Sequence, residues 1–110
     1  MRKHARRDDN HRMVVDALRA IGATVLDLAD VGGGCPDVLV GFRGKNVLLE
    51  IKDGRKPPSA CNLTIAEAAF IERWRGDPVR VVESVADALL AIGVVATPLP
   101  GRDPDEDLQF

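Results

Sequence analysis

Three residues whose side chains could do chemistry together stand in the middle of the chain. Asp37 begins one β-rich segment, and Glu50 and Lys52 stand at the end of the next. Glu50 interrupts the apolar run 47–51, which is typical of an interior strand. An unpaired charge in such a strand would cost several kcal/mol, so the sequence predicts that other charged groups compensate Glu50.

The segments 37–42 and 46–52 are joined by a short connection containing a glycine, which predicts a β-hairpin. An even number of connecting residues, two or four, predicts that Phe42 lies opposite Val47. Because side chains alternate along a strand, one face of the hairpin is then entirely apolar. That face would consist of Val38, Val40, Phe42, Val47, Leu49 and Ile51.

The same register predicts that Asp37 lies opposite Lys52 and diagonal to Glu50, with β-carbons about 5 to 8 Å apart. Two carboxylates and one ammonium leave a residual negative charge, which a divalent cation would neutralise. Hard oxygen ligands favour Mg²⁺, with Mn²⁺ as a substitute, over zinc. Such a cation could polarise a phosphodiester and activate a water, while Lys52 orients that water or stabilises the developing charge. A turn acid at Asp37 and a plain ion pair between Glu50 and Lys52 are the structural alternatives.

The flanking sequence predicts the elements that position these residues. Apolar residues with helical spacing, behind Asp8 or Asp9 as a cap and ahead of Gly22, predict a first helix. They are Val14, Ala17, Leu18 and Ile21. A strand over 24–28 and a glycine-rich loop over 31–36 should follow.

After the hairpin, Thr64 and Glu67 form a T-x-x-E capping box that predicts a second helix. Phe70 and Trp74 in this helix have the spacing of core packing residues. A short strand over 78–82 and a third helix opened by Ser84 complete the order α-β-β-β-α-β-α. The sequence therefore predicts an α/β fold, a mixed sheet with helices on both faces.

The chain of 110 residues, with 45% hydrophobic and 29% charged residues, has the size and composition of one folded domain. We expect a basic N-terminal arm over 1–8, the domain over 9–95 and a flexible acidic tail over 96–110. The net charge is −2, but four acids and no base stand in the last eight residues, which leaves +2 for the first 102. No stretch is apolar enough to span a membrane, and the two cysteines suit a reducing cytoplasm.

Pro36-Asp37 followed by Glu50-Ile51-Lys52 resembles the signature of the PD-(D/E)XK nucleases, and the predicted element order resembles their restriction-endonuclease-like core. The stretch from about Asp9 to Ile92 is similar to the small stand-alone VRR-NUC nucleases of phages and bacteria. Further motifs support this similarity: Arg7-Asp8, Gly34 to Asp37, Glu50 to Gly54, Lys56-Pro57-Pro58, Leu63-Thr64 and Trp74.

The resemblance implies Asp37, Glu50 and the main-chain carbonyl of Ile51 as magnesium ligands, and Lys52 as the catalytic lysine. It also implies a structure-selective endonuclease, acting as a homodimer on branched DNA such as Holliday junctions. His11 stands near a position where relatives often carry an acid or Gln, and Glu67 stands near a Gln of relatives. Both are candidate supporting residues, although the capping box already accounts for Glu67.

Basic residues near the predicted site are candidates for DNA binding. Arg55 and Lys56, beside two prolines, form either a phosphate clamp or a solvated loop. Arg6 and Arg7 would contact the phosphate backbone from the N-terminal arm, unless that arm is a disordered tail. A non-catalytic nucleic-acid-binding module with the same fold is the alternative function, favoured by the modest +2 of the folded part.

Overall fold

The computed structural model describes residues 9–56 and 62–94. These residues form a mixed four-stranded sheet with three helices, in the predicted order α-β-β-β-α-β-α. The elements are α1 (Asp9–Ala20), β1 (Thr24–Asp27), β2 (Val38–Phe42), β3 (Lys45–Ile51), α3 (Ile65–Arg73), β4 (Arg80–Val82) and α4 (Val85–Ala91). The predicted basic arm over 1–8 and acidic tail over 96–110 lie outside the described residues.

The sheet has the strand order β1-β2-β3-β4, with β1, β2 and β3 antiparallel and β4 parallel to β3. Strand β3 is therefore an interior strand, and all its residues from Val47 to Ile51 are buried. An interior position explains why 47–51 is almost continuously apolar. It also means that Glu50 is an acid in the middle of the sheet.

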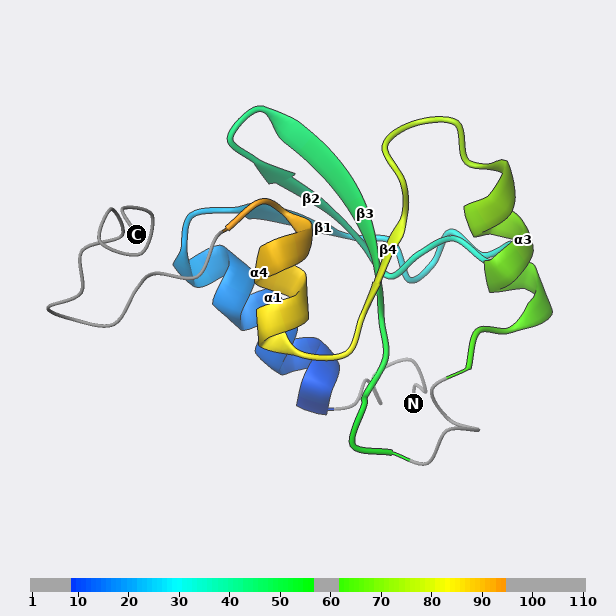
Figure 1. Ribbon diagram of the computed structural model, residues 1–110, viewed down its shortest axis with the longest axis horizontal. Coiled ribbons are helices and arrows are strands. Elements are labelled where there is room, and N and C mark those ends of the chain that lie inside the picture. Colours follow the sequence, from blue (N-terminus) through cyan, green and yellow to red (C-terminus); the bar gives the residue numbers. More distant parts are fainter. Residues whose placement is uncertain (1–8, 57–61, 95–110) are drawn as a thin grey trace, which may run out of the picture.

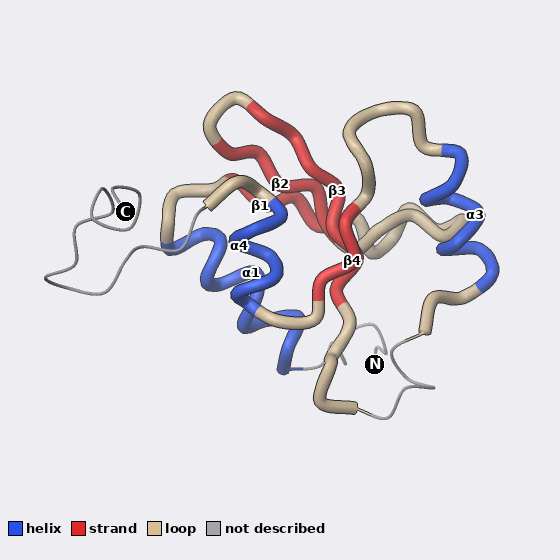
Figure 2. The backbone as a smooth tube through the Cα atoms, viewed as in Figure 1, coloured by secondary structure: helices blue, strands red, loops and turns tan. Residues whose placement is uncertain are grey.

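Helices α1 and α4 lie side by side on one face of the sheet (Figures 1 and 2). The main core lies between these helices and the strands, and its largest fully buried side chains are Val14, Leu18, Val38, Val40, Leu49 and Val82. The predicted apolar stripe of α1 is confirmed at Val14 and Leu18. It is wrong at Ile21, which is exposed because the helix ends at Ala20 and the chain turns at Gly22 with a φ of 95°.

Helix α3 lies on the other side of the sheet and covers that face only in part (Figure 1). The predicted capping box is present: Thr64 Oγ1 accepts a hydrogen bond from Glu67 N–H, and Glu67 Oε1 accepts one from Thr64 N–H. None of its residues from Ile65 to Arg73 is buried. The prediction that Phe70 and Trp74 are core residues is wrong, because they stack on each other outside the core, and Trp74 is 43% exposed.

The glycine-rich loop between β1 and β2 reaches across to the first turn of α3 (Figure 1). Gly34 has a φ of +82°, and a Cβ at this position would overlap the carbonyl group of Ala66 and lie 2.9 Å from Glu67 N. Only glycine combines this backbone conformation with so close an approach. Gly34 is thus the point at which the loop holds the start of α3.

Within the described part of the chain, none of the helices has the length and apolar character that a bilayer crossing requires.

Replacing Gly34 by Ala should destabilise the protein by about 3 kcal/mol or more, because backbone strain adds to the overlap with Ala66. Gly33→Ala is the matched control: its φ is +67°, but nothing lies within 4 Å of the added Cβ. The control should cost only about 1 to 2 kcal/mol of backbone strain. Urea unfolding followed by circular dichroism measures both changes, and equal losses would contradict the close contact with α3.

Candidate functional site

The hairpin that carries the site turns one residue earlier than the sequence predicted. Phe42 pairs with Lys45 and Val38 with Leu49, so the predicted pairs Phe42 with Val47 and Asp37 with Lys52 are wrong by two residues. The reason is the turn, in which Arg43 as well as Gly44 has a positive φ, 51° and 81°. Two such residues make a two-residue turn at positions 43 and 44, whose twist matches the flanking strands.

A shift of two residues leaves every side chain on its predicted face, because the side-chain period of a strand is two. Val38, Val40, Val47 and Leu49 are accordingly all buried on the face that packs against the helices. Continuing the observed register by one residue places Asp37 opposite Glu50 rather than opposite Lys52. The two carboxylates are therefore closer together than the sequence predicted.

Asp37 closes the end of the ladder between β2 and β3. Its Oδ2 accepts a hydrogen bond of 2.7 Å from the backbone N–H of Ile51, and its own carbonyl accepts one of 2.9 Å from Leu28 N–H. The Asp37 side chain thus takes the place of a strand carbonyl where β2 has not yet begun. This bond fixes one carboxylate oxygen beside β3.

Glu50 is only 3% exposed and lies among other charged groups. Lys52 Nζ is 3.5 Å from Glu50 Oε2 and 3.1 Å from Glu67 Oε1. Burial raises the pKa of Glu50 to about 8, and the charge of Asp37 and the contact with Glu67 add to this rise while Lys52 opposes it. One ammonium does not neutralise three carboxyl groups, so keeping all three ionised would reduce the stability of the folded protein.

Glu67 performs two tasks with one oxygen atom. Its Oε1 accepts hydrogen bonds from Thr64 N–H at 2.9 Å and from Lys52 Nζ at 3.1 Å. Burial alone would raise the pKa of Glu67, but hydrogen bonds from Thr64, Lys52 and Glu50 lower it overall. The capping interpretation of Glu67 is therefore confirmed, and the same carboxylate also positions Lys52.

Asn10 supports the site from α1, although the sequence predicted no role for it. This side chain is buried, and its Nδ2 donates hydrogen bonds to the carbonyl oxygens of Lys52 at 2.6 Å and Glu83 at 3.2 Å. Lys52 N–H in turn donates to Val82 O at 2.9 Å. The available signal was the position of Asn10 four residues before Val14, which places a polar residue on the buried stripe of the helix.

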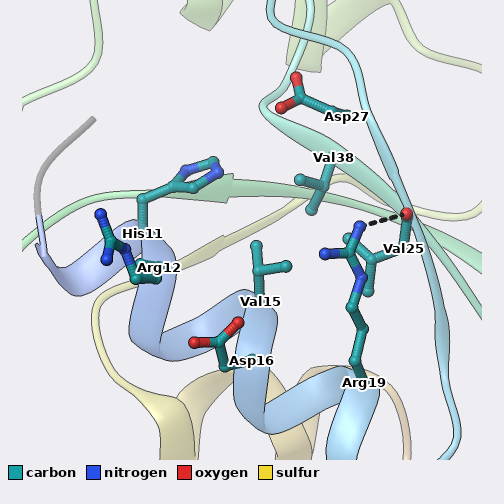
Figure 3. A pocket seen from close by; sticks show the side chains of 8 residues that line it. All are labelled: His11, Arg12, Val15, Asp16, Arg19, Val25, Asp27 and Val38. Carbon is teal, nitrogen blue, oxygen red and sulfur yellow. Dashed lines mark hydrogen bonds between the residues drawn. The ribbon is translucent and has the colours of Figure 1, made fainter. Parts of the chain in front are cut away.

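His11 lies on the other side of the sheet from the carboxyl groups. It lines a hollow of about 230 Å³ together with Asp27, Val15 and Val38, between α1 and the first two strands (Figure 3). Asp27 pairs with Val38, so its side chain is on the helix-covered face, whereas Asp37 and Glu50 are on the opposite face. The supporting role of His11 stays a prediction.

The predicted DNA-binding residues are placed only in part. Arg55 binds Asp53 through Nε at 2.9 Å to Oδ1 and through a terminal nitrogen at 2.9 Å to Oδ2. These hydrogen bonds from Arg55 lower the pKa of Asp53 to about 2, so the pair is charged at neutral pH. Lys56 follows and is exposed. Arg6 and Arg7 lie outside the described residues.

Of the described residues, no group of three or more His, Cys, Asp or Glu has an arrangement that could hold a metal ion. Asp37 and Glu50 form a two-carboxylate arrangement instead, with Glu67 engaged by Lys52. Burial and the charges of Glu50 and Asp37 raise the pKa of Cys35, which keeps this neighbouring thiol protonated. No family model matches the chain, and neither a curated protein nor a solved structure matches it.

The raised pKa of Glu50 predicts how stability depends on pH in metal-free buffer. The folded protein binds this proton more tightly than the unfolded chain, whose Glu has a pKa near 4.5. Protonated Glu50 therefore stabilises the folded state fully below about pH 4.5, and this stabilisation is lost as the pH rises through about 8. Its size should be on the order of a few kcal/mol.

Urea unfolding between pH 5 and pH 8 in EDTA tests this dependence. Glu50→Gln should remove most of the loss of stability with rising pH, because the amide stays neutral throughout. Glu72→Gln, at an exposed position of α3, should leave the loss unchanged. A Glu50→Gln variant with the pH profile of the parent protein would show that Glu50 is not the group that titrates.

Proposed function

We propose that this protein is a magnesium-dependent DNA endonuclease that hydrolyses phosphodiester bonds by attack of water. One observation carries the proposal: a nearly completely buried Glu50 lies beside Asp37 in a cluster with more acids than bases. Burying excess negative charge is costly unless a cation completes the site. The resemblance of the motif around Asp37, Glu50 and Lys52 to the PD-(D/E)XK nucleases supports the same function.

The donor atoms fit magnesium. Asp37 and Glu50 supply carboxylate oxygens, and Ile51 can supply a third oxygen from the main chain. Because Ile51 N–H donates to Asp37 and the N–H and C=O of one strand residue point to the same edge, its carbonyl also faces the Asp37 side. Mg²⁺ prefers few protein oxygens and several waters, and Mn²⁺ accepts the same ligands. Bound by these residues, the ion would polarise the phosphodiester and lower the pKa of the attacking water.

Lys52 acts in this proposal as a permanent cation. Burial alone would lower its pKa, but hydrogen bonds and charges from Glu67 and Glu50 raise it above the usual value. A lysine that keeps its proton is a poor general base and a good hydrogen-bond donor. Lys52 would therefore stabilise the negative charge that develops on the phosphate oxygens and orient the water.

The substrate, assembly and location follow from the resemblance and remain part of the proposal. We propose branched DNA such as Holliday junctions as the substrate, in the cytoplasm of a bacterial or phage-infected cell. Cutting two strands of a junction needs two active sites, so we propose a homodimer. The basic stretch 43–56 runs into the site and would face the phosphate backbone.

Lys52→Ala should reduce cutting by at least about a hundredfold, because it removes a charged donor to the phosphate. The assay uses a panel of labelled linear, flap, splayed and four-way DNA with magnesium. Arg80→Ala, which removes an exposed cation on β4, should cut as the parent protein does. Unchanged cutting by Lys52→Ala would remove its catalytic role. Binding of DNA that persists in EDTA, with no product in Mg²⁺ or Mn²⁺, would instead support the non-catalytic module.

Magnesium should raise the thermal midpoint of the protein by several degrees, because a ligand that binds only the folded state stabilises it. The increase should be larger at pH 8 than at pH 5, since the ion must displace the proton of Glu50. Asp37→Asn should lose the increase, and Asp30→Asn, in an exposed turn, should keep it. Equal midpoints with and without millimolar magnesium would contradict the metal site.

A further inference from the structure

The face of the sheet that carries Glu50 continues into a second feature, which the proposed reaction does not use. Alternation along the hairpin places Leu39, Asn46 and Leu48 on the same face as Glu50. These residues line a hollow of about 390 Å³ together with Lys45, Asp77 and Trp74. We refer to it as the Trp74 hollow. Its floor is apolar, and its rim is polar.

One wall of the hollow is an aromatic ring held in a defined plane. The rings of Trp74 and Phe70 stack with centroids 5.4 Å apart and planes 14° apart. The Arg73 guanidinium lies 5.1 Å from the centre of the Phe70 ring. Gly76 lies close to the indole, since a Cβ there would be 2.9 Å from Nε1 of Trp74. Despite these contacts Trp74 stays 43% exposed, so a fixed indole surface faces solvent.

Helix α3 links this wall to the proposed catalytic cluster. Glu67, Phe70 and Trp74 are spaced by three and four residues, which places them on one side of the helix. Glu67 holds Lys52 at one end of this side, and Trp74 stands at the C-cap at the other end. Seven residues of helix span about 10 Å. Along β3, Leu48 is two residues, or about 7 Å, from Glu50. The hollow therefore begins within reach of a nucleotide next to the cut phosphate.

We propose that the Trp74 hollow binds an unpaired nucleobase of the strand that is cut, stacked against Trp74 over Leu39 and Leu48. This inference rests on the proposed nuclease function and narrows its substrate class. Stacking on aromatic side chains is the common way in which proteins hold unpaired bases, and it tolerates every base. A base inside a duplex has both faces covered by its neighbours, so it must leave the stack to enter. The preferred DNA thus has a single-stranded region beside the cut.

The charged residues at the rim of the hollow are compatible with a bound nucleotide. Lys45 is the cation that lines the hollow. A phosphate that follows the stacked base would meet Lys45. Asp77 supplies an acceptor for the amino groups of a base rather than a partner for phosphate.

The single tryptophan of the chain, with no tyrosine present, makes the test direct. Intrinsic fluorescence then reports Trp74 alone. The full-length protein is titrated in EDTA, so that no cutting occurs, with a single-stranded oligonucleotide and with a blunt duplex of the same sequence. We expect strong quenching by the single strand and little change with the duplex.

Trp74→Ala should weaken single-strand binding about tenfold, measured by anisotropy of labelled DNA, and leave duplex binding unchanged. Trp74→Phe should retain most of the affinity, which separates loss of the ring from loss of the fold. Ile65→Ala is the matched control on α3: this side chain is 91% exposed and lies outside the hollow, so its loss should have no effect.

The outcomes separate the hollow from the nuclease activity. Quenching by the single strand without cutting in magnesium would support the base site and contradict the endonuclease. Cutting of branched DNA, with no quenching and with Trp74→Ala as active as the parent protein, would overturn the base site alone. The protein is also diluted without DNA. A change in fluorescence that accompanies a change in its size in solution would overturn the base site, because a second copy of the chain would then cover Trp74.

Discussion

The buried carboxyl group of Glu50 is the constraint on which the site depends. An acid in the interior strand of a four-stranded sheet requires either a proton, a lysine or a metal ion as partner. Its neighbours are arranged around this need: Lys52 approaches from just beyond the end of β3, Glu67 from α3 and Asp37 from just before β2. Removing negative charge would reduce the repulsion within this cluster and stabilise the fold. The reaction we propose requires the same negative charge, because it binds the cation. The site is therefore a place where stability and function oppose each other.

One face of the sheet provides stability, and the other carries the candidate site. The face under α1 and α4 holds the apolar core and no member of the carboxyl cluster, so it provides the stability that the other face lacks. On the opposite face α3 is held by a small number of specific contacts, chiefly the close approach at Gly34 and the polar connection from Glu67 to Lys52. Because Glu67 also caps α3, the start of this helix and the position of Lys52 are determined together. A helix held in this way can present Trp74 without burying it.

Hydrophobic patterning correctly predicted the features that a two-residue shift of register leaves unchanged. The element order and the two faces of the hairpin are confirmed, because alternation depends only on an even or odd count. The exact pairing was wrong because Arg43, a residue that rarely adopts a positive φ, does so in the turn. Continued by one residue, the observed register puts Asp37 opposite Glu50 rather than diagonal to it, so the two acids are closer than the sequence indicated.

By itself, the sequence determined which residues could form a site: an acid, a second acid and a lysine, on two strands and on one face. It determined this because residue type and side-chain alternation are local properties. Only the tertiary structure decided that Glu67 reaches Lys52, that Asn10 holds the backbone of Lys52 from α1, and that Trp74 lies outside the core. Each of these depends on how a helix docks on the sheet, and the contact between Asn10 and Lys52 joins residues 42 positions apart in the chain. No local pattern encodes such contacts, because they arise when the whole chain packs and its buried polar groups find partners.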